Sequence, residues 1–236
     1  MTGHGGEDDA ERNYGKRTMI KGRAVIFDMD GIIFDSERLV LDCWERLAEK
    51  YRLDGMHEAY LPCIGTNDAR TKEIMMNYYG PDFDYDRFRQ ESSVIFHEIV
   101  DKEGLPVKKG ARELLEFLRE NKIPVGLASS TRLAVVTAEL RQAGLYDFFQ
   151  AVTGGDQLER SKPEPDIYLM ACGKLGVRPE DTYAVEDSYN GIRSASSAGM
   201  KPVMVPDLLP PTEEMRQKSV IVLEDLLQVR DWFQNL

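Results

Sequence analysis

The chain has 236 residues, of which 42% are hydrophobic and 30% are charged, so it can bury a core of ordinary size. Its formal net charge of −11 argues against a general nucleic-acid binder or an anionic-membrane binder, because both need a basic surface. Three scattered cysteines are too few for a disulfide framework or a zinc site, and no apolar run approaches the roughly 18 residues of a membrane span. We therefore expect free thiols in a reducing compartment and a cytoplasmic protein.

The predicted strands are short apolar runs separated by helical patterns. Residues 1–20 come first; they are polar, lack the apolar core of a secretory signal, and are interpreted as a mobile tail. Helical spacing occurs at 111–118 and 135–143, and strands that alternate with helices predict a doubly wound, mostly parallel, Rossmann-like α/β core. The predicted strands, apolar on both faces as in a parallel sheet, are 23–27, 123–128, 151–153, 183–185, 202–205 and 220–223.

A long segment after the first strand interrupts this alternation. Apolar residues recur at helical spacing within 39–47 and 85–100, and no strand pattern lies between them. We therefore expect a helical cap inserted into the α/β core. Residues 35–37 are expected to cap its first helix, to support the site residues or act as a hinge, or to do both. The expected boundaries are 21–35 and 105–236 for the catalytic core, 36–104 for the cap, and 34–37 and 103–108 for the hinges.

Polar residues follow several of the predicted strands. Ligands of open α/β sheets bind beyond the carboxyl ends of the strands, so these side chains are expected to gather at one edge. They are Asp28, Asp30, Ser129, Ser130, Thr131, Glu186 and Asp187, with Lys162 in a proline-flanked loop nearby.

The acids of this group indicate a Mg²⁺ site. Two like charges about 4 Å apart cost roughly 4 kcal/mol at an effective dielectric near 20, so several carboxylates in one place need a cation. An all-oxygen ligand set with room for water suits Mg²⁺. We expect ligands from Asp28, Glu186 and Asp187, and from the backbone carbonyl of Asp30. Gly31 lets the backbone turn and approach a ligand closely.

Beside such a metal, Asp28 can act as a nucleophile. Its attack on phosphorus would give an aspartyl-phosphate that water later hydrolyses. The metal and Lys162 would offset the repulsion between carboxylate and phosphate, and N–H groups after Ser129 would hold phosphate oxygens. Asp30 fits the general acid that protonates the leaving alcohol and the base that then activates water.

Four motifs contain these residues. The first is DMDGIIFDSE at 28–37, the second is Ser129 after its strand, the third is SKPEPD at 161–166, and the fourth is VEDSYNGI at 185–192. In their order, and with a helical insertion after the first, they resemble the haloacid dehalogenase-like hydrolase superfamily, in particular its beta-phosphoglucomutase-like and sugar-phosphatase branch. The resemblance extends over about residues 23 to 223.

The resemblance implies a role for each motif residue. Asp28 would be the nucleophile and a metal ligand, and Asp30 the acid and base. Ser129 and Lys162 would bind the transferring phosphoryl group. Glu186 and Asp187 would complete the metal site, Glu186 directly or through water. The substrate would lie between core and cap, with further contacts from Gly31, Ser130, Thr131, Arg132, Thr66 and Asn67.

The function expected from these assignments is that of a monomeric, Mg²⁺-dependent phosphatase acting on a small sugar or sugar-alcohol phosphate. The alternative is a beta-phosphoglucomutase, which transfers the phosphoryl group to another sugar hydroxyl. Mutases that this chain resembles carry a histidine and an arginine in the cap where it has Val40 and Asp68, which favours the phosphatase. A dehalogenase would leave Asp30 without a task, a phosphonate hydrolase would need a cap lysine such as Lys50 or Lys72, and a non-enzymatic receiver domain would carry no cap.

Overall fold

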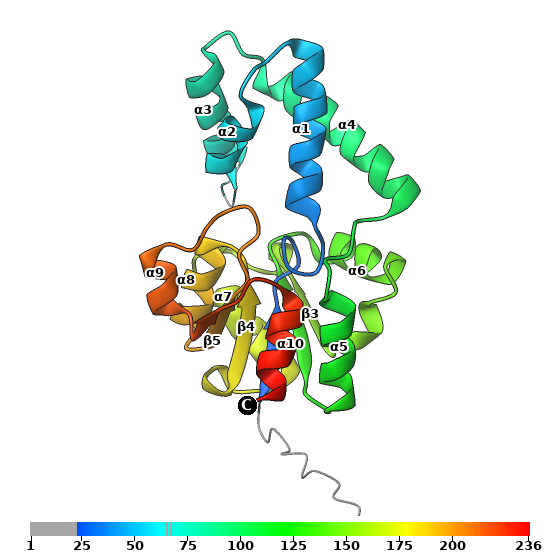
Figure 1. Cartoon of the computed structure of the whole chain (residues 1–236), viewed down its shortest axis with the longest axis vertical. Coiled ribbons are helices and arrows are strands. Elements are labelled where there is room, and N and C mark those ends of the chain that lie inside the picture. Colours follow the sequence, from blue (N-terminus) through cyan, green and yellow to red (C-terminus); the bar gives the residue numbers. More distant parts are fainter. Residues whose placement is uncertain (1–22, 65, 67) are drawn as a thin grey trace, which may run out of the picture.

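The computed structural model describes residues 23–64, 66 and 68–236, so the expected tail at 1–20 and Asn67 lie outside the described residues. One six-stranded sheet lies in the lower half of Figure 1, with the strand order β3-β2-β1-β4-β5-β6 and every neighbouring pair parallel. The predicted doubly wound fold is confirmed, and each predicted strand is present. The strands are β1 (Ala24–Phe27), β2 (Val125–Ser129), β3 (Ala151–Gly154), β4 (Thr182–Glu186), β5 (Lys201–Met204) and β6 (Ile221–Val222).

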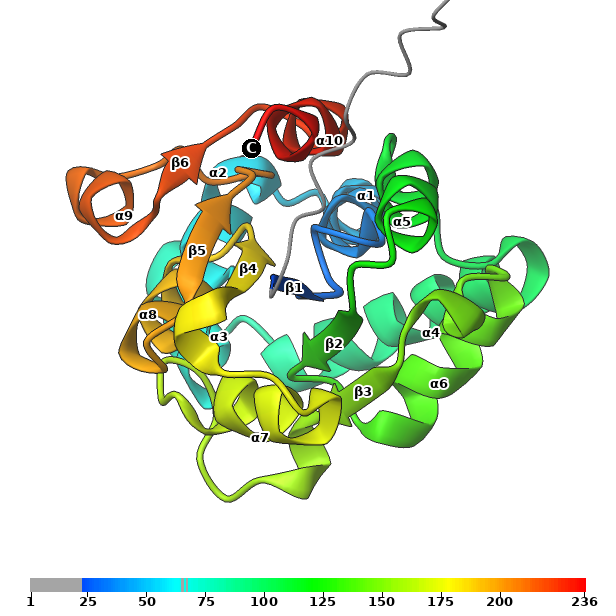
Figure 2. The same cartoon turned by 90° about the horizontal axis from the view of Figure 1, so that it is seen from below.

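Helices cover both faces of this sheet (Figure 2). Side chains alternate between the two faces of a strand, so Phe27 of β1 packs in one hydrophobic cluster while Ile26 packs in another. The first cluster includes side chains of α5, α6 and α10, and the second includes side chains of α7 and α8. All of β1 is therefore buried, which explains why the strands read as unbroken apolar runs. The helices are α5 (Ala111–Glu120), α6 (Leu133–Gln142), α7 (Asp166–Leu175), α8 (Tyr189–Ser197), α9 (Glu213–Lys218) and α10 (Leu226–Gln234), with 3-10 turns η2 (Tyr146–Phe148), η3 (Gly155–Gln157) and η4 (Pro179–Asp181).

A second group of helices, called the helical cap below, stands above the carboxyl ends of the strands (Figure 1). As predicted, the described residues of this segment contain no strand. Its hydrophobic cluster includes Trp44, whose ring meets those of Tyr60 and Phe88 edge-on, with centroids 5.1 and 5.5 Å apart. The cap helices thus have a core of their own. They are α1 (Ser36–Tyr51), α2 (Met56–Tyr60), η1 (Leu61–Cys63), α3 (Asp68–Tyr79) and α4 (Tyr85–Glu103).

Two linkers run side by side between the helical cap and the sheet. Phe34 is fully buried and forms a backbone bridge with Val107 of the second linker. The backbone N–H of Asp35 donates to the carbonyl of Pro106 at 2.8 Å. Asp35 occupies the N-cap position of α1, but its side chain makes no capping hydrogen bond. Side-chain capping by Asp35 is therefore wrong, whereas Ser36 of the same segment does support a site residue, because its Oγ donates to Asp30 Oδ1 at 2.7 Å.

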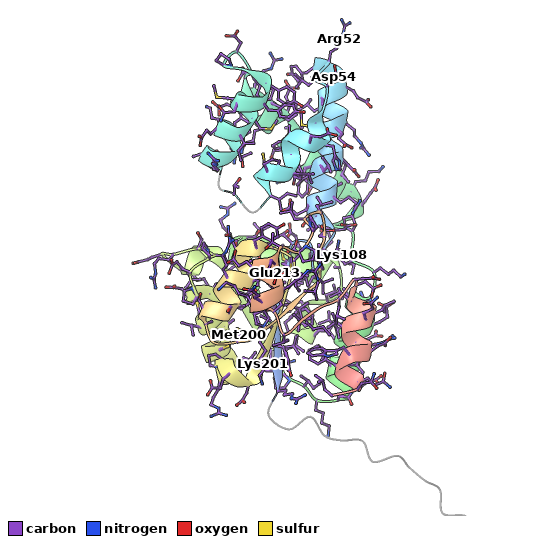
Figure 3. All side chains as sticks on the ribbon, turned by 60° about the vertical axis from the view of Figure 1, so that its left-hand side comes forward. Arg52, Asp54, Lys108, Met200, Lys201 and Glu213 are labelled. Carbon is purple, nitrogen blue, oxygen red and sulfur yellow. The ribbon has the colours of Figure 1, made fainter. Side chains whose placement is uncertain are left out.

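Lys108 connects both linkers to the core, where the helical cap meets the sheet (Figure 3). Its Nζ donates to Asp35 Oδ1 at 3.1 Å and to Asp207 Oδ1 at 2.5 Å. Asp207 lies in the loop after β5, and the adjacent Leu208 packs against the hydrophobic cluster of the cap. One ammonium group thus links the first linker, the second linker and a core loop.

The cysteines and the polarity of the helices were also considered in the sequence predictions. The three cysteines, Cys43, Cys63 and Cys172, are free and buried, as their spacing predicted. Across residues 23–64, 66 and 68–236, no helix is both long and apolar enough to cross a membrane.

Candidate active site

The loop after β1 carries two aspartates with different partners. Asp28 directly follows the strand, and its backbone N–H donates to the carbonyl of Val185 in β4 at 3.0 Å. Asp30 accepts a hydrogen bond from Ser36 Oγ at 2.7 Å through Oδ1, and one from Thr131 Oγ1 at 3.4 Å through Oδ2. Asp30 is thus held by the first residue of the helical cap and by the loop after β2, while the backbone of Asp28 is bonded to the neighbouring strand β4.

Gly31 allows Asp187 to approach this loop. Its φ of +77° lies in the region that glycine adopts without strain. A Cβ at this position would collide with the Asp187 carboxylate. Both the turn and the close approach therefore require glycine, which brings the acid after β4 next to the aspartates after β1.

Lys162 lies between two carboxylates. Its Nζ donates to Asp28 Oδ1 and to Glu186 Oε1, each at 2.6 Å, and to the carbonyl of Ala128 at 3.3 Å. Only 7% of the lysine side chain is exposed. The loop between β3 and α7 therefore delivers one ammonium group to the carboxyl ends of β1, β2 and β4.

Glu186 has both carboxylate oxygens occupied. Oε1 accepts from Lys162 and from Tyr168 OH, the latter at 2.9 Å. Oε2 accepts from the backbone N–H groups of Asp187 and Ser188 and from Ser188 Oγ, each at 3.0 Å. In contrast, the Asp187 carboxylate has no hydrogen-bond donor among the described residues. Glu186 therefore serves mainly to hold Lys162, whereas Asp187 keeps its oxygens available.

Burial shifts Asp28, Asp30 and Asp187 toward their neutral forms. Burial raises the pKa of Asp28 to about 8, although the Lys162 ammonium opposes the shift, and the Glu186 charge adds to it. Burial also raises the pKa of Asp187 well above its usual range, and Glu186 and Asp28 add to that shift. The pKa of Asp30 is raised by burial as well, against the hydrogen bond from Ser36. One ammonium does not balance this set of carboxylates, and a bound cation would.

Asp28, Glu186 and Asp187 are close enough to share a metal ion. One oxygen of each lies within 4.8 Å of the others, and all three residues are buried. A site made of carboxylate oxygens fits a hard divalent cation such as Mg²⁺. Asp28 Oδ2 and the Asp187 carboxylate are free of donors among the described residues, so these two can coordinate directly. Glu186, whose oxygens are occupied, fits a contact through water.

The loop after β2 forms another side of the site. Ser129 is fully buried, and its Oγ accepts from the backbone N–H of Thr131 at 3.1 Å. The backbone N–H of Leu133, the first residue of α6, donates to Asp156 Oδ1 at 2.8 Å. Two of the N–H groups expected to hold phosphate oxygens are therefore already bonded within the protein. Ser130 and Arg132, two predicted substrate contacts, are exposed on this loop.

A cavity of about 440 Å³ lies within the helical cap. Thr66, Val40 and Asp68, all considered from the sequence, line it. Glu37 also lines it and directly follows Ser36, the partner of Asp30. Burial raises the pKa of Glu37 and the nearby Asp30 charge adds to the shift, so the cavity adjoins Asp30. The structure thus brings the core motifs together at one edge of the sheet and sets the cap cavity beside them.

Sequence reasoning missed two residues that hold Glu186. Tyr168 is fully buried in α7. A tyrosine on the apolar face of a helix is predicted to be a core residue, so nothing in the local sequence indicates its contact with Glu186. Ser188 is the N-cap of α8, where its Oγ accepts from Gly191 N–H at 3.0 Å. A serine before a helical segment is a readable capping signal, although capping alone does not indicate its contact with Glu186.

Known proteins resemble this chain in sequence and in fold. The model of the haloacid dehalogenase-like hydrolases matches residues 25–205. The phosphorylated carbohydrates phosphatase of Thermotoga maritima is 32% identical over 182 residues, which cover 75% of this chain and 82% of that protein. The beta-phosphoglucomutase of Bacillus subtilis is 30% identical over 219 residues, 86% of this chain and 92% of that protein. A hydrolase structure from Deinococcus radiodurans with bound phosphate and sodium has the same fold, with a TM-score of 0.77 at 24% identity over 90% of this chain and 95% of that one.

Proposed function

This chain belongs to the haloacid dehalogenase-like hydrolase family and is a phosphomonoester hydrolase, and on this premise we propose that it is a Mg²⁺-dependent phosphatase of a sugar or sugar-alcohol phosphate. The observation that carries the proposal is the contact of Lys162 with both Asp28 and Glu186 at 2.6 Å. A buried ammonium between two acids, beside the free carboxylate of Asp187, suits the binding of a phosphoryl group and a cation together. The similarity to a phosphatase of phosphorylated carbohydrates supports the substrate class.

In the proposed mechanism, Asp28 is the nucleophile. One oxygen of its carboxylate attacks phosphorus, the bond between phosphorus and the alcohol oxygen breaks, and an aspartyl-phosphate forms. Asp30, held by Ser36 and Thr131, gives its proton to the leaving oxygen. It then takes a proton from the water that hydrolyses the aspartyl-phosphate, so both aspartates return to their starting forms.

Lys162 and the acids around it determine how the negative charge of the transferring phosphoryl group is offset. Lys162 binds the transferring phosphoryl group and offsets its negative charge, with Ser129 as a second contact. Mg²⁺ held by Asp28, Asp187 and the Asp30 carbonyl would supply further positive charge at the phosphoryl oxygens. Glu186 orients Lys162 through its direct hydrogen bond and contributes to the metal site through water.

The helical cap favours water over a sugar hydroxyl as the final phosphoryl acceptor. Val40 and Asp68, which stand where similar mutases have a histidine and an arginine, both line the cap cavity. Asp68 is also paired with Arg89, at 2.7 Å between Oδ1 and Nε. A beta-phosphoglucomutase remains the second candidate because the core chemistry is the same and a mutase is among the similar proteins.

The domain boundaries, the oligomeric state and the cellular compartment are part of the same proposal. Residues 36–104 act as a cap that closes over the core of 21–35 and 105–236, and the protein works as a monomer in the cytoplasm. The free, buried cysteines support a reducing compartment. The proposed substrate contacts are Gly31, Ser130, Thr131, Arg132 and Thr66.

Hydrolysis of p-nitrophenyl phosphate with and without MgCl₂ tests the function. We expect sustained phosphate release that is lost on adding EDTA and restored by excess Mg²⁺. Asp28→Asn should abolish turnover, and Asp30→Asn should lower kcat by about 100-fold or more through lost proton transfer. Asp147→Asn, a change at an exposed aspartate away from the site, is the matched control and should retain full activity. Full activity of Asp28→Asn, or turnover that EDTA does not affect, would reject the proposal. Isomerisation of β-glucose 1-phosphate without phosphate release would favour the mutase.

A further inference from the structure

Among the described residues that line the cavity of the helical cap, one acidic side chain has no partner of opposite charge. Among the described residues that line it, Glu37, Asp68 and Arg89 are those ordinarily charged at neutral pH. Arg89 Nε lies 2.7 Å from Asp68 Oδ1, so these two charges offset each other. Glu37 has no cationic partner among the described residues. The rest of the described wall consists of aromatic, aliphatic and hydroxyl side chains and the thiol of Cys63.

One oxygen of Glu37 is held and the other is free. Oε2 accepts from Tyr60 OH at 2.5 Å, whereas Oε1 has no donor among the described residues. Tyr60 is 4% exposed, and its ring packs edge-on against that of Trp44 with the centroids 5.1 Å apart, so packing fixes the position of its hydroxyl group. Glu37 therefore offers an oriented hydrogen-bond acceptor at the wall of the cavity.

The position of this acceptor relates it to the leaving group of the reaction. Ser36, the residue before Glu37, donates to Asp30 Oδ1 at 2.7 Å. Asp30 is the proposed proton donor to the leaving oxygen, so the leaving group lies next to these residues. A hydroxyl group there would find an acceptor in Glu37 Oε1. A second phosphate there would face a carboxylate with no unbalanced cation in the described wall to offset it.

We propose that the cavity selects monophosphates whose leaving group is uncharged and bears hydroxyl groups. In this inference Glu37 determines specificity as the hydroxyl acceptor, and Tyr60 is the positioning residue that orients it. The inference rests on the proposed phosphatase function and narrows its substrate class. It also separates this chain from a mutase, because a sugar phosphate that receives a phosphoryl group at the core would carry a second phosphate into the cap.

Three probes test the selection: fructose 6-phosphate, fructose 1,6-bisphosphate and p-nitrophenyl phosphate. We expect the wild-type kcat/KM for the monophosphate to exceed that for the bisphosphate by about tenfold or more, the size of one charge-assisted hydrogen bond. Glu37→Gln should reduce this ratio to within about threefold and lower the ratio of fructose 6-phosphate to p-nitrophenyl phosphate about tenfold. Glu98→Gln, a change at an exposed glutamate of α4 outside the cavity, should leave both ratios unchanged.

The role of Tyr60 has its own test. Tyr60→Phe should raise KM for fructose 6-phosphate with little change in kcat, and it should add nothing in the Glu37→Gln background because it acts through Glu37. Additive effects would indicate a structural role and remove Tyr60 from the inference.

The outcomes separate the inference from the function on which it rests. Equal or faster release from the bisphosphate, unchanged ratios in Glu37→Gln, or release from p-nitrophenyl phosphate alone would overturn the selection and leave a phosphatase. No release from any of the three probes would overturn the phosphatase function and the selection with it.

Discussion

Replacing Lys108 with methionine should destabilise the protein by about 2–3 kcal/mol. Lys108→Met removes the donor that lies 2.5 Å from Asp207 Oδ1, and Asp207 Oδ2 already has no partner. The Asp207 side chain is 4% exposed, so its charge would remain buried and unpaired. Breaking a buried ion pair in this way costs about 3–5 kcal/mol. Lys108 is itself 20% exposed, and Arg38 Nη2 remains 3.9 Å from Asp207 Oδ1, so solvent and Arg38 reduce the expected loss.

Urea denaturation followed by tryptophan fluorescence measures this loss. Lys109→Met is the matched control, because Lys109 is exposed beside Lys108, and it should change the free energy of unfolding by less than about 0.5 kcal/mol. The double variant Lys108→Met/Asp207→Leu should recover much of the loss, since it removes both polar partners together. A loss below about 1 kcal/mol in Lys108→Met, or a larger loss in the double variant, would refute the reasoning.

Two further predictions concern Glu139 and Gly31. Glu139 Oε2 is buried without a partner, and burial raises its pKa to about 7, with the Asp30 charge adding to the shift and His97 opposing it. The unfolded pKa is about 4.3, so the folded state binds the proton more tightly, and stability falls as pH rises from about 4 to 7. Glu139→Gln should therefore be about 1–2 kcal/mol more stable than wild type at pH 8, after allowing for solvent screening of a half-exposed group, and equal to it near pH 4.5 in thermal unfolding; a difference independent of pH would contradict this. Gly31→Ala should cost about 1–2 kcal/mol in stability for its backbone conformation and lower phosphatase activity at least about tenfold, because the new methyl group displaces the Asp187 carboxylate. Gly80→Ala has a similar backbone cost but no atom within 4 Å of its added Cβ, so equal activity losses in the two variants would count against the steric explanation.

The sequence alone predicted the α/β core and the residues of its four motifs. All residues of β1, β2 and β4 are buried, so these strands appear in the sequence as unbroken apolar runs. The outer strands β3, β5 and β6 are partly half-buried, but they are also short and mostly apolar, and they could be located as well. The helical spacing of the cap was equally local and equally readable. Asp28, Asp30, Glu186 and Asp187 could be grouped because the carboxyl ends of parallel strands meet at one edge of a sheet.

Only the tertiary structure decided which side chains meet across long stretches of sequence. The motifs predicted that Lys162 lies near Asp28, but not the direct hydrogen bond between them across 134 positions. No residue pattern indicated the contact of Lys108 with Asp207 across 99 positions. The same holds for Tyr60 and Glu37, whose contact depends on how α2 packs beside α1. The spacing of apolar residues shows which face of a helix or strand is buried. A hydrogen bond between two elements depends in addition on how those elements pack against each other. For that reason the sequence indicated the chemistry of the core, while the partners that orient its acids, and the acceptor that we propose selects its substrate, became visible only in the fold.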